Sequence, residues 1–294
     1  MVAERVPPRR WARRACAVAL LFGVAIGNAA AEGDAKRGQY LAMAGGCVGC
    51  HTEDRKDAVP FAGGRALRTR FGTFYGPNLT PHPQAGLGRW TEADFVRAMR
   101  EGVRPDGAHY YPAFPYPSFT RISDRDLSDL WAYLRTLPPN SRPSQAHELR
   151  FLFGFRAAVG AWKWLYFTPG PIGSDSGRTA TVDRGAYLGE ALGHCGECHT
   201  PRNFLGSLKR DQPLAGGKGP TGKDVPNLTP TRLKKWSDGE LKEFLLSGIT
   251  PDFDSTDAAM AEVVRNTTSQ LTAADLAALI AYLRSLPPLP EAPR

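Results

Sequence analysis

Two short cysteine motifs, each followed at once by histidine, constrain this chain more than any other feature of its sequence. The first reads Cys-Val-Gly-Cys-His at residues 47–51, and the second reads Cys-Gly-Glu-Cys-His at residues 195–199. The chain has five cysteines, and the fifth is Cys16 near the N-terminus. The identical spacing and the adjacent histidines argue against the ordinary use of paired cysteines in structural disulfides.

The N-terminal 31 residues have the organisation of an export signal. Arginines at 5, 9, 10, 13 and 14 precede an apolar run at residues 15–26, and three alanines follow at 29–31. The run is shorter than the roughly 20 apolar residues that span a bilayer, so a signal peptide over 1–31 is predicted, with an uncleaved N-terminal anchor as the alternative. We therefore expect a periplasmic protein, either free or peripherally associated with the inner membrane.

Removal of this segment also changes the charge. The full chain carries 37 Lys+Arg against 29 Asp+Glu, a formal net charge of +8, and loss of five Arg and one Glu leaves +4. A net charge of +4 does not favour binding to nucleic acid, because that function depends on a strong excess of basic residues. Cys16 leaves with the same segment, so all the other cysteines belong to the two motifs.

The rest of the chain contains an internal repeat, in which one module occurs twice. The same landmarks occur in the same order around both cysteine motifs. We predict a first module over residues 32–139, an aromatic-rich linker over 140–182 and a second module over 183–290. The repeated landmarks are Arg-Gly-x-Tyr-Leu at 37–41 and 184–188, Ala-Gly-Gly at 62–64 and 215–217, Pro-Asn-Leu-Thr-Pro at 77–81 and 226–230, and Ala-Tyr-Leu-Arg-x-Leu-Pro-Pro at 132–139 and 281–288.

The secondary structure is predicted to be mainly α-helical, with hardly any strand pattern. Apolar residues at i, i+3, i+4 and i+7 mark a helix before each double proline, and Ser123 and Thr272 stand where an N-cap is expected. Modules of about 105 residues with so much loop need something to fill their centres, because small domains bury a smaller share of their surface. A large apolar cofactor in each module would supply this. The two apolar stripes are Leu127, Leu130, Trp131, Leu134 and Leu276, Leu279, Ile280, Leu283.

The linker is rich in aromatic residues between positions 151 and 167, but Arg150, Arg156 and Lys163 interrupt it. Charges inside the apolar run argue against a membrane-spanning helix. Packing of the linker onto the modules is one interpretation. Contact with a membrane surface or a partner subunit through residues 149–168 is the other.

Cys-x-x-Cys-His is the attachment sequence of c-type haem, in which two thiols bond the porphyrin and the histidine ligates iron. A single copy could also be a redox-active thiol pair or half of a zinc site. Two copies in a repeat behind an export signal favour two covalently bound haem c groups. Cys47, Cys50, Cys195 and Cys198 then attach the haems, and His51 and His199 ligate the irons.

The second axial ligand is expected to be methionine in one module only. A thioether opposite histidine raises the reduction potential. Met260 lies in a predicted loop before the last helix, where it could reach the second haem. Met43 precedes the first motif by four residues and Met99 lies in a predicted helix, so both are expected in the core.

At this point the whole chain after residue 31 resembles the diheme cytochromes c related to the cytochrome subunits of periplasmic alcohol, gluconate and similar dehydrogenases. The resemblance implies two tandem cytochrome c-type domains, each wrapped around its haem, and two haems rather than the three of those subunits. It rests on residues 193–203 (Gly-His-Cys-Gly-Glu-Cys-His-Thr-Pro-Arg-Asn), 260–267 (Met-Ala-Glu-Val-Val-Arg-Asn-Thr) and 111–116 (Tyr-Pro-Ala-Phe-Pro-Tyr).

The last of these stretches departs from the family at one position. The dehydrogenase subunits usually have methionine where this chain has Phe114, and phenylalanine cannot bind iron. The first haem is therefore expected to be open or water-bound, or to take another donor, with His109 as the first candidate and His82 as a weaker one. The nearby tyrosines, Tyr110 and Tyr111, are expected to pack or to contact a propionate. No role is expected for His147 beyond structure, and His194 is taken as structural or surface.

These observations predict an electron carrier that accepts electrons from a periplasmic dehydrogenase or another donor and delivers them to a respiratory acceptor. An open first haem would also allow a diheme peroxidase type of enzyme, although no acid–base pair for that reaction is evident. A non-catalytic subunit that docks through the aromatic linker is a third reading.

Overall fold

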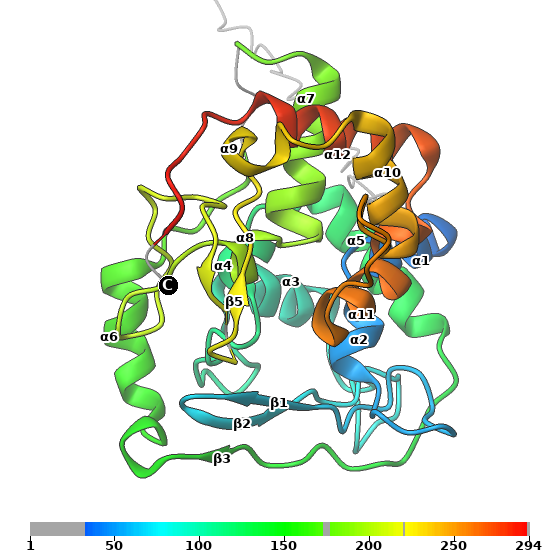
Figure 1. Cartoon of the computed structure of the whole chain (residues 1–294). Coiled ribbons are helices and arrows are strands. Elements are labelled where there is room, and N and C mark those ends of the chain that lie inside the picture. Colours follow the sequence, from blue (N-terminus) through cyan, green and yellow to red (C-terminus); the bar gives the residue numbers. More distant parts are fainter. Residues whose placement is uncertain (1–32, 173–176, 220, 293–294) are drawn as a thin grey trace, which may run out of the picture. The chain divides into compact units, whose positions relative to one another are not determined.

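The computed structural model describes residues 33–172, 177–219 and 221–292; the predicted export segment lies outside them. Helices dominate this part of the chain (Figure 1). The elements of the first half are α1 (Ala35–Ala44), α2 (Cys47–His51), β1 (Ala66–Thr69), β2 (Gly72–Tyr75), α3 (Glu92–Glu101), α4 (Tyr116–Phe119) and α5 (Asp124–Thr136).

The chain continues through the predicted linker into a second series of similar elements. The linker contributes β3 (Glu148–Leu149), η1 (Phe151–Phe153) and α6 (Arg156–Tyr166). The later elements are α7 (Ala180–Ala186), η2 (Tyr187–Leu192), α8 (Gly196–His199), β4 (Gly217–Lys218), β5 (Asp224–Val225), α9 (Pro230–Leu233), α10 (Asp238–Ser247), α11 (Ala258–Asn266), η3 (Thr268–Gln270) and α12 (Ala273–Ser285).

The two predicted terminal helices form with the predicted caps. The side chain of Ser123 accepts a hydrogen bond from the backbone of Asp126 at the start of α5, and Thr272 does the same with Asp275 in α12. These side chains satisfy backbone donors that a helix start leaves unpaired. The sequence therefore predicted both helix starts correctly.

A glycine allows the first helix of each half to pack closely on the last one. A β-carbon on Gly38 of α1 would lie 1.9 Å from the carbonyl oxygen of Asp129 in α5. The same test at Gly185 of α7 gives 2.0 Å to the carbonyl oxygen of Ala278 in α12. Because only glycine lacks this carbon, the Arg-Gly landmark of each half is a helix-crossing signal.

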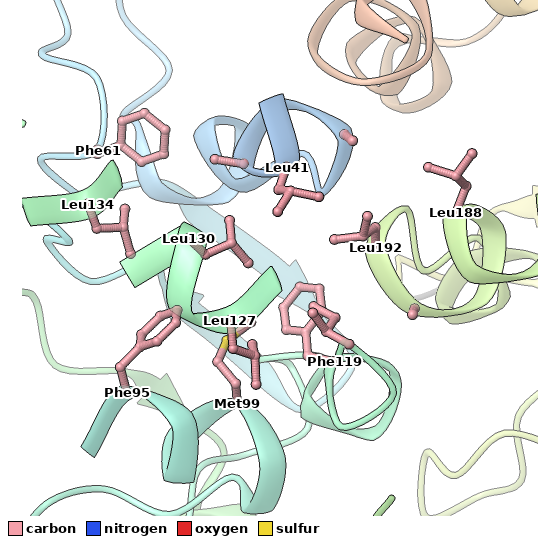
Figure 2. Packing of buried hydrophobic residues seen from close by; sticks show 14 of the residues in the cluster. Leu41, Phe61, Phe95, Met99, Phe119, Leu127, Leu130, Leu134, Leu188 and Leu192 are labelled. Atoms are coloured by element: carbon pink, nitrogen blue, oxygen red, sulfur yellow. The ribbon is translucent and has the colours of Figure 1, made fainter. Parts of the chain in front are cut away.

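The largest apolar core joins residues that are distant in the sequence. Leu41 of α1 and Leu127 of α5 are almost fully buried in it, together with Leu188 and Leu192 of η2 from the second half (Figure 2). A second core lies among α10, α12 and the residues around them, including Leu241 and Leu276. The first core therefore also holds the two halves together.

Small sheets that the sequence did not reveal lie beside the helices. Strands β1 and β2 form an antiparallel hairpin, and β3 of the linker pairs with β2 through Gly72 and Thr73. Strands β4 and β5 form the second, shorter pair. The linker is thus part of the first half's sheet, and the predicted boundaries after residues 139 and 182 stay a prediction, since the described residues from 33 on group into one unit by their contacts.

Helix α6 of the linker directs its charged side chains toward the rest of the protein. Arg156 donates a hydrogen bond to the carbonyl oxygen of His109 at 2.8 Å, and Lys163 donates to the carbonyl oxygen of Glu101. The charged residues therefore face the protein, while Trp164 is 85% exposed and Leu165 is 58% exposed. Within the described residues, no helix has both the length and the apolar character needed to cross a bilayer.

Candidate functional site

The two Cys-x-x-Cys-His motifs each form a single helical turn. The first is α2, and the second includes α8. The residue before the first cysteine has a left-handed backbone in both cases: Gly46 has φ 62°, and His194 has φ 41°. This conformation suits glycine and is uncommon for histidine, so the second motif holds His194 in a less favourable backbone conformation.

The four cysteines are unpaired thiols. Burial raises the pKa of Cys47 to about 12 and those of Cys50 and Cys195 to about 11. A redox-active pair needs a thiolate that forms readily, so these surroundings oppose that alternative. Nor does any group of three or more His, Cys, Asp or Glu side chains in the described residues have a metal-binding arrangement.

Both motif histidines are held by the same hydrogen bond. His51 donates from Nδ1 to the carbonyl oxygen of Pro77 at 2.8 Å, and His199 donates from Nδ1 to that of Pro226 at 2.8 Å. Burial lowers the pKa of both imidazoles. Each ring is therefore neutral, with its proton on Nδ1 and the lone pair of Nε2 available for a metal, which is the usual way a protein orients a histidine ligand.

The proline carbonyls are themselves fixed by the Pro-Asn-Leu-Thr-Pro landmarks. Asn78 and Asn227 are almost completely buried, and each accepts at 2.7 Å from the hydroxyl of the threonine two residues later. Each asparagine also donates to the chain just after the last helix of its half, at Asn140 and Leu289. The landmark thus ties each motif histidine to the segment after the last helix of its half.

The residues around the motifs fit covalently held haem. Each motif supplies two unpaired thiols on one helical turn and an oriented neutral imidazole. Buried polar atoms without a partner also lie among the surrounding side chains of the described structure: Tyr116 Oη, His194 Nδ1 and Arg202 Nε. Buried polar groups normally have hydrogen-bond partners, so these atoms are suited to receive polar groups of a bound molecule, such as haem propionates.

Met260 is not in a loop, as the sequence reading placed it, but in the first turn of α11. Asp257 caps this helix and accepts from the backbone of Met260 at 2.9 Å. The charge of Asp257 raises the pKa of His199 against the larger effect of burial, so the start of α11 lies near the second motif. Met260 and Cys195 pack against the same apolar cluster.

The other two methionines differ in position. Met99 is buried in the first core, as predicted. Met43 was expected in the core too, but on α1 it is only half-buried. Assignment of Met260 as the axial ligand of the second haem stays a prediction.

Phe114 takes part in an aromatic cluster. Its ring centroid lies 5.2 Å from that of Tyr110, 5.7 Å from Phe119 and 6.3 Å from Tyr116. The hydroxyl of Tyr111 donates to the carbonyl oxygen of Gly154 at 3.1 Å, so this tyrosine joins the linker to the first half. Phe114 is therefore part of an apolar, aromatic wall.

His109 and His82, the candidate sixth ligands of the first haem, each contact other parts of the protein. His109 Nδ1 lies 3.3 Å from Lys163 Nζ, and a β-carbon on Gly160 would lie 3.1 Å from His109 Nε2. Both ring nitrogens thus lie beside α6. His82 Nδ1 accepts from the backbone of Ala85 at 3.1 Å and closes a turn. His147 Nδ1 accepts from the backbone of Tyr75.

Each motif is also covered by a segment from the opposite half, which the sequence reading missed. On the first motif, Glu262 of α11 pairs with Arg65 at 2.6 Å and lies beside Gly49. On the second, Glu197 accepts from Ser118 at 3.0 Å, and His194, expected to be structural or at the surface, is half-buried and stacks on Phe119. A single sequence carries no signal for such long-range pairing, because no periodicity links these residues.

The comparisons with known proteins agree with this chemistry. The family profile of cytochrome c matches residues 35–138. Over 87% of its length, the chain is 46% identical to a diheme cytochrome c-type protein of Cereibacter sphaeroides, of which it covers 86%. The chain therefore belongs to the cytochrome c family, and its haems are of the covalently bound c type.

Within that family it is also similar to subunits of larger enzymes. It is 39% identical over 85% of its length to the fructose dehydrogenase cytochrome subunit of Gluconobacter japonicus. It is 37% identical over 93% of its length to the cytochrome c subunit of the quinone alcohol dehydrogenase of Gluconobacter oxydans. The chain spans only 52% and 59% of those two proteins.

Proposed function

We propose that this protein is a periplasmic electron carrier with two covalent haem c groups, which takes electrons from a dehydrogenase subunit or another donor and passes them to a respiratory acceptor. The observation that carries the proposal is the paired geometry of His51 and His199, each with Nδ1 bound to a proline carbonyl. The same arrangement on two haem-attachment motifs favours two sites of one kind. The relatives that are dehydrogenase cytochrome subunits support the choice of donor.

In this proposal the protein's residues attach the haems, orient the iron ligands and shield the haems from solvent. Cys47 with Cys50, and Cys195 with Cys198, form thioether bonds, while the neutral imidazoles ligate iron. When bound, haem supplies the one-electron chemistry. The residues just before the two motifs lie close together, since a β-carbon on Gly193 would lie 3.9 Å from the carbonyl oxygen of Ala44.

The two halves are proposed to set different reduction potentials. Met260 would give the second site a thioether ligand, which favours the reduced iron. Phe114 offers no donor at the corresponding place in the first half, so the first site is open or takes His109 as a sixth ligand. Ligation by His109 would require its ring to leave the contacts with Lys163 and Gly160. Electron flow is then from the first site to the second.

The linker segment 149–168 is proposed as a contact with a partner subunit or with the outer face of the inner membrane. Phe151 is 82% exposed, and Trp164 and Leu165 lie on the outer side of α6. Exposed aromatic residues beside basic side chains such as Arg150 are typical of interfacial segments. Sedimentation with lipid vesicles distinguishes the two partners, using the protein and a Trp164→Ser, Leu165→Ser variant. If the protein binds vesicles and the variant does not, the segment contacts the membrane. If neither binds vesicles, the segment contacts a subunit.

A peroxidase function is not proposed, because the relatives reported are cytochromes and dehydrogenase subunits. His109 also faces α6, and His82 closes a turn. Electron paramagnetic resonance of the oxidised protein together with a potentiometric titration tests the electron-carrier proposal. We expect two one-electron steps, with the Met260 site at the higher potential. A lower potential for that site would overturn the direction of flow, and rapid turnover of hydrogen peroxide would overturn the carrier function.

A further inference from the structure

A cluster of exposed apolar side chains lies at the end of α10 and on the turn that follows it. Phe253 is 92% exposed, Ile249 is 46% exposed, and Leu246 and Val263 are also exposed. Phe253 has φ 59°, a left-handed backbone that is uncommon for an aromatic residue. A large apolar side chain held at the tip of such a turn costs stability and gains no burial within this chain.

The same turn borders a surface depression of about 420 Å³. Its lining includes Gly248 and Ile249 from the turn, Thr256, and Ala261, Val264 and Arg265 from α11. Helix α11 carries Met260 in its first turn. A molecule seated in this depression would therefore contact the helix that carries the candidate iron ligand.

The first half contains an equivalent turn, and there it is covered. Residues 103 and 109 form an antiparallel bridge after α3, as residues 249 and 255 do after α10. Each turn follows a helix that ends on a left-handed glycine, Gly102 or Gly248. In the first half α6 lies on the turn and donates from Arg156 and Lys163 to the carbonyl oxygens of His109 and Glu101. Helix α6 is thus an example, within this chain, of a helix that binds such a turn through basic side chains.

The charges on the second turn complement a basic helix. Asp252, Asp254 and Asp257 are exposed around Phe253, and Glu243 is exposed on α10. The basic neighbours are Arg265, in the lining of the depression, and Lys242. Carboxylates attract Arg and Lys side chains like those on the inward face of α6, and they repel an anionic lipid surface.

We propose that the surface formed by Leu246, Ile249, Phe253 and the adjoining depression is a docking site for an amphipathic helix of a partner protein. The helix would present basic residues to the acidic turn, as α6 presents Arg156 and Lys163 to the turn of the first half, and apolar residues to Phe253. Recognition of this kind lays the apolar face of a helix into an apolar groove. The proposal concerns binding and holds whichever direction electrons take.

The test uses the purified holoprotein and a synthetic peptide with the sequence of residues 156–166, in which the outward-facing Trp164 and Leu165 are replaced by glutamine for solubility. Nuclear magnetic resonance of the reduced protein measures binding. We expect resonance shifts confined to residues 246–265. The Phe253→Gly variant should weaken binding at least tenfold, and because glycine suits the left-handed backbone, it should keep the stability of the parent protein.

Two controls make the result specific. Phe204→Gly removes another exposed aromatic residue, which is 78% exposed, and should leave the affinity unchanged. A peptide with Arg156→Glu and Lys163→Glu should bind at least tenfold more weakly. Equal binding by the parent protein and the Phe253→Gly variant, or shifts outside residues 246–265, would overturn the proposal. A dimer in sedimentation that Phe253→Gly abolishes would also overturn it, in favour of a second copy of this chain.

Discussion

Tyr40 donates a hydrogen bond from its hydroxyl to Asp275 Oδ2 at 2.6 Å, although 235 positions separate the two residues. Its counterpart is Tyr187, which donates to Asp126. Each carboxylate also pairs with an arginine of its own half, Asp275 with Arg184 and Asp126 with Arg37. The ion pair that joins the first and last helices of each half is therefore completed by a tyrosine from the other half.

We expect Tyr40→Phe and Tyr187→Phe each to lower the free energy of unfolding by about 1.5–3 kcal/mol, since each removes one hydrogen bond to a charged, largely buried group. Urea unfolding of the holoprotein measures the change. Tyr75→Phe is the matched control, because Tyr75 also donates to a carboxylate, Glu148, but on the exposed surface. If all three variants lose the same stability, the tyrosines do not have the proposed joining role.

Stability should depend on pH through Asp275. Burial raises the pKa of this carboxyl, but hydrogen bonds from Arg184 and Tyr40 and the charge of Arg184 outweigh it, so its pKa is lowered on folding. The contribution is complete above the unfolded pKa of about 3.9 and is lost as the pH falls through the lower folded value. Urea unfolding between pH 2.5 and 6 should show a smaller pH dependence for Asp275→Asn than for the parent. Asp211→Asn, at an exposed position, should leave it unchanged.

Gly38→Ala should destabilise the protein strongly, because the new methyl group would clash with the carbonyl oxygen of Asp129. Overpacking of this kind costs on the order of 1–3 kcal/mol and can cost more against rigid backbone. Gly239→Ala is the control within a helix: a β-carbon there comes no closer than 3.9 Å to other atoms, and alanine should stabilise α10 by up to about 1 kcal/mol. Thermal unfolding of the two variants should therefore shift in opposite directions.

Met260→Leu should abolish the near-infrared absorption band that arises from a methionine–iron bond and lower the reduction potential of one site. Leucine has a similar volume, so the cost in stability should stay below about 1.5 kcal/mol. Met99→Leu, in the first core, should keep both the band and the potential. Retention of the band in Met260→Leu would show that another residue is the ligand.

Several local features of the structure could be predicted from the sequence. The caps at Ser123 and Thr272 form as expected, and Met99 is buried. These features depend on neighbours a few residues away in a helix, where the spacing of 3.6 residues per turn leaves a readable pattern. Other predictions failed because they needed partners from distant segments. Met260 was placed in a loop, and the pairing of β3 with β2 and the contact of Glu262 with the first motif were missed.

What the sequence alone determined is the chemistry: two thiol pairs, each with an adjacent histidine, at matching places in a repeated series of landmarks. Tertiary structure decided how that chemistry is held. Only folding brings Pro77 and Pro226 to the Nδ1 atoms of His51 and His199, sets α11 over the first motif and Phe119 against the second, and turns the charged residues of α6 inward. The reason is physical: attachment residues must be neighbours in the chain, whereas orientation and burial depend on contacts between segments that the backbone brings together only when it is folded.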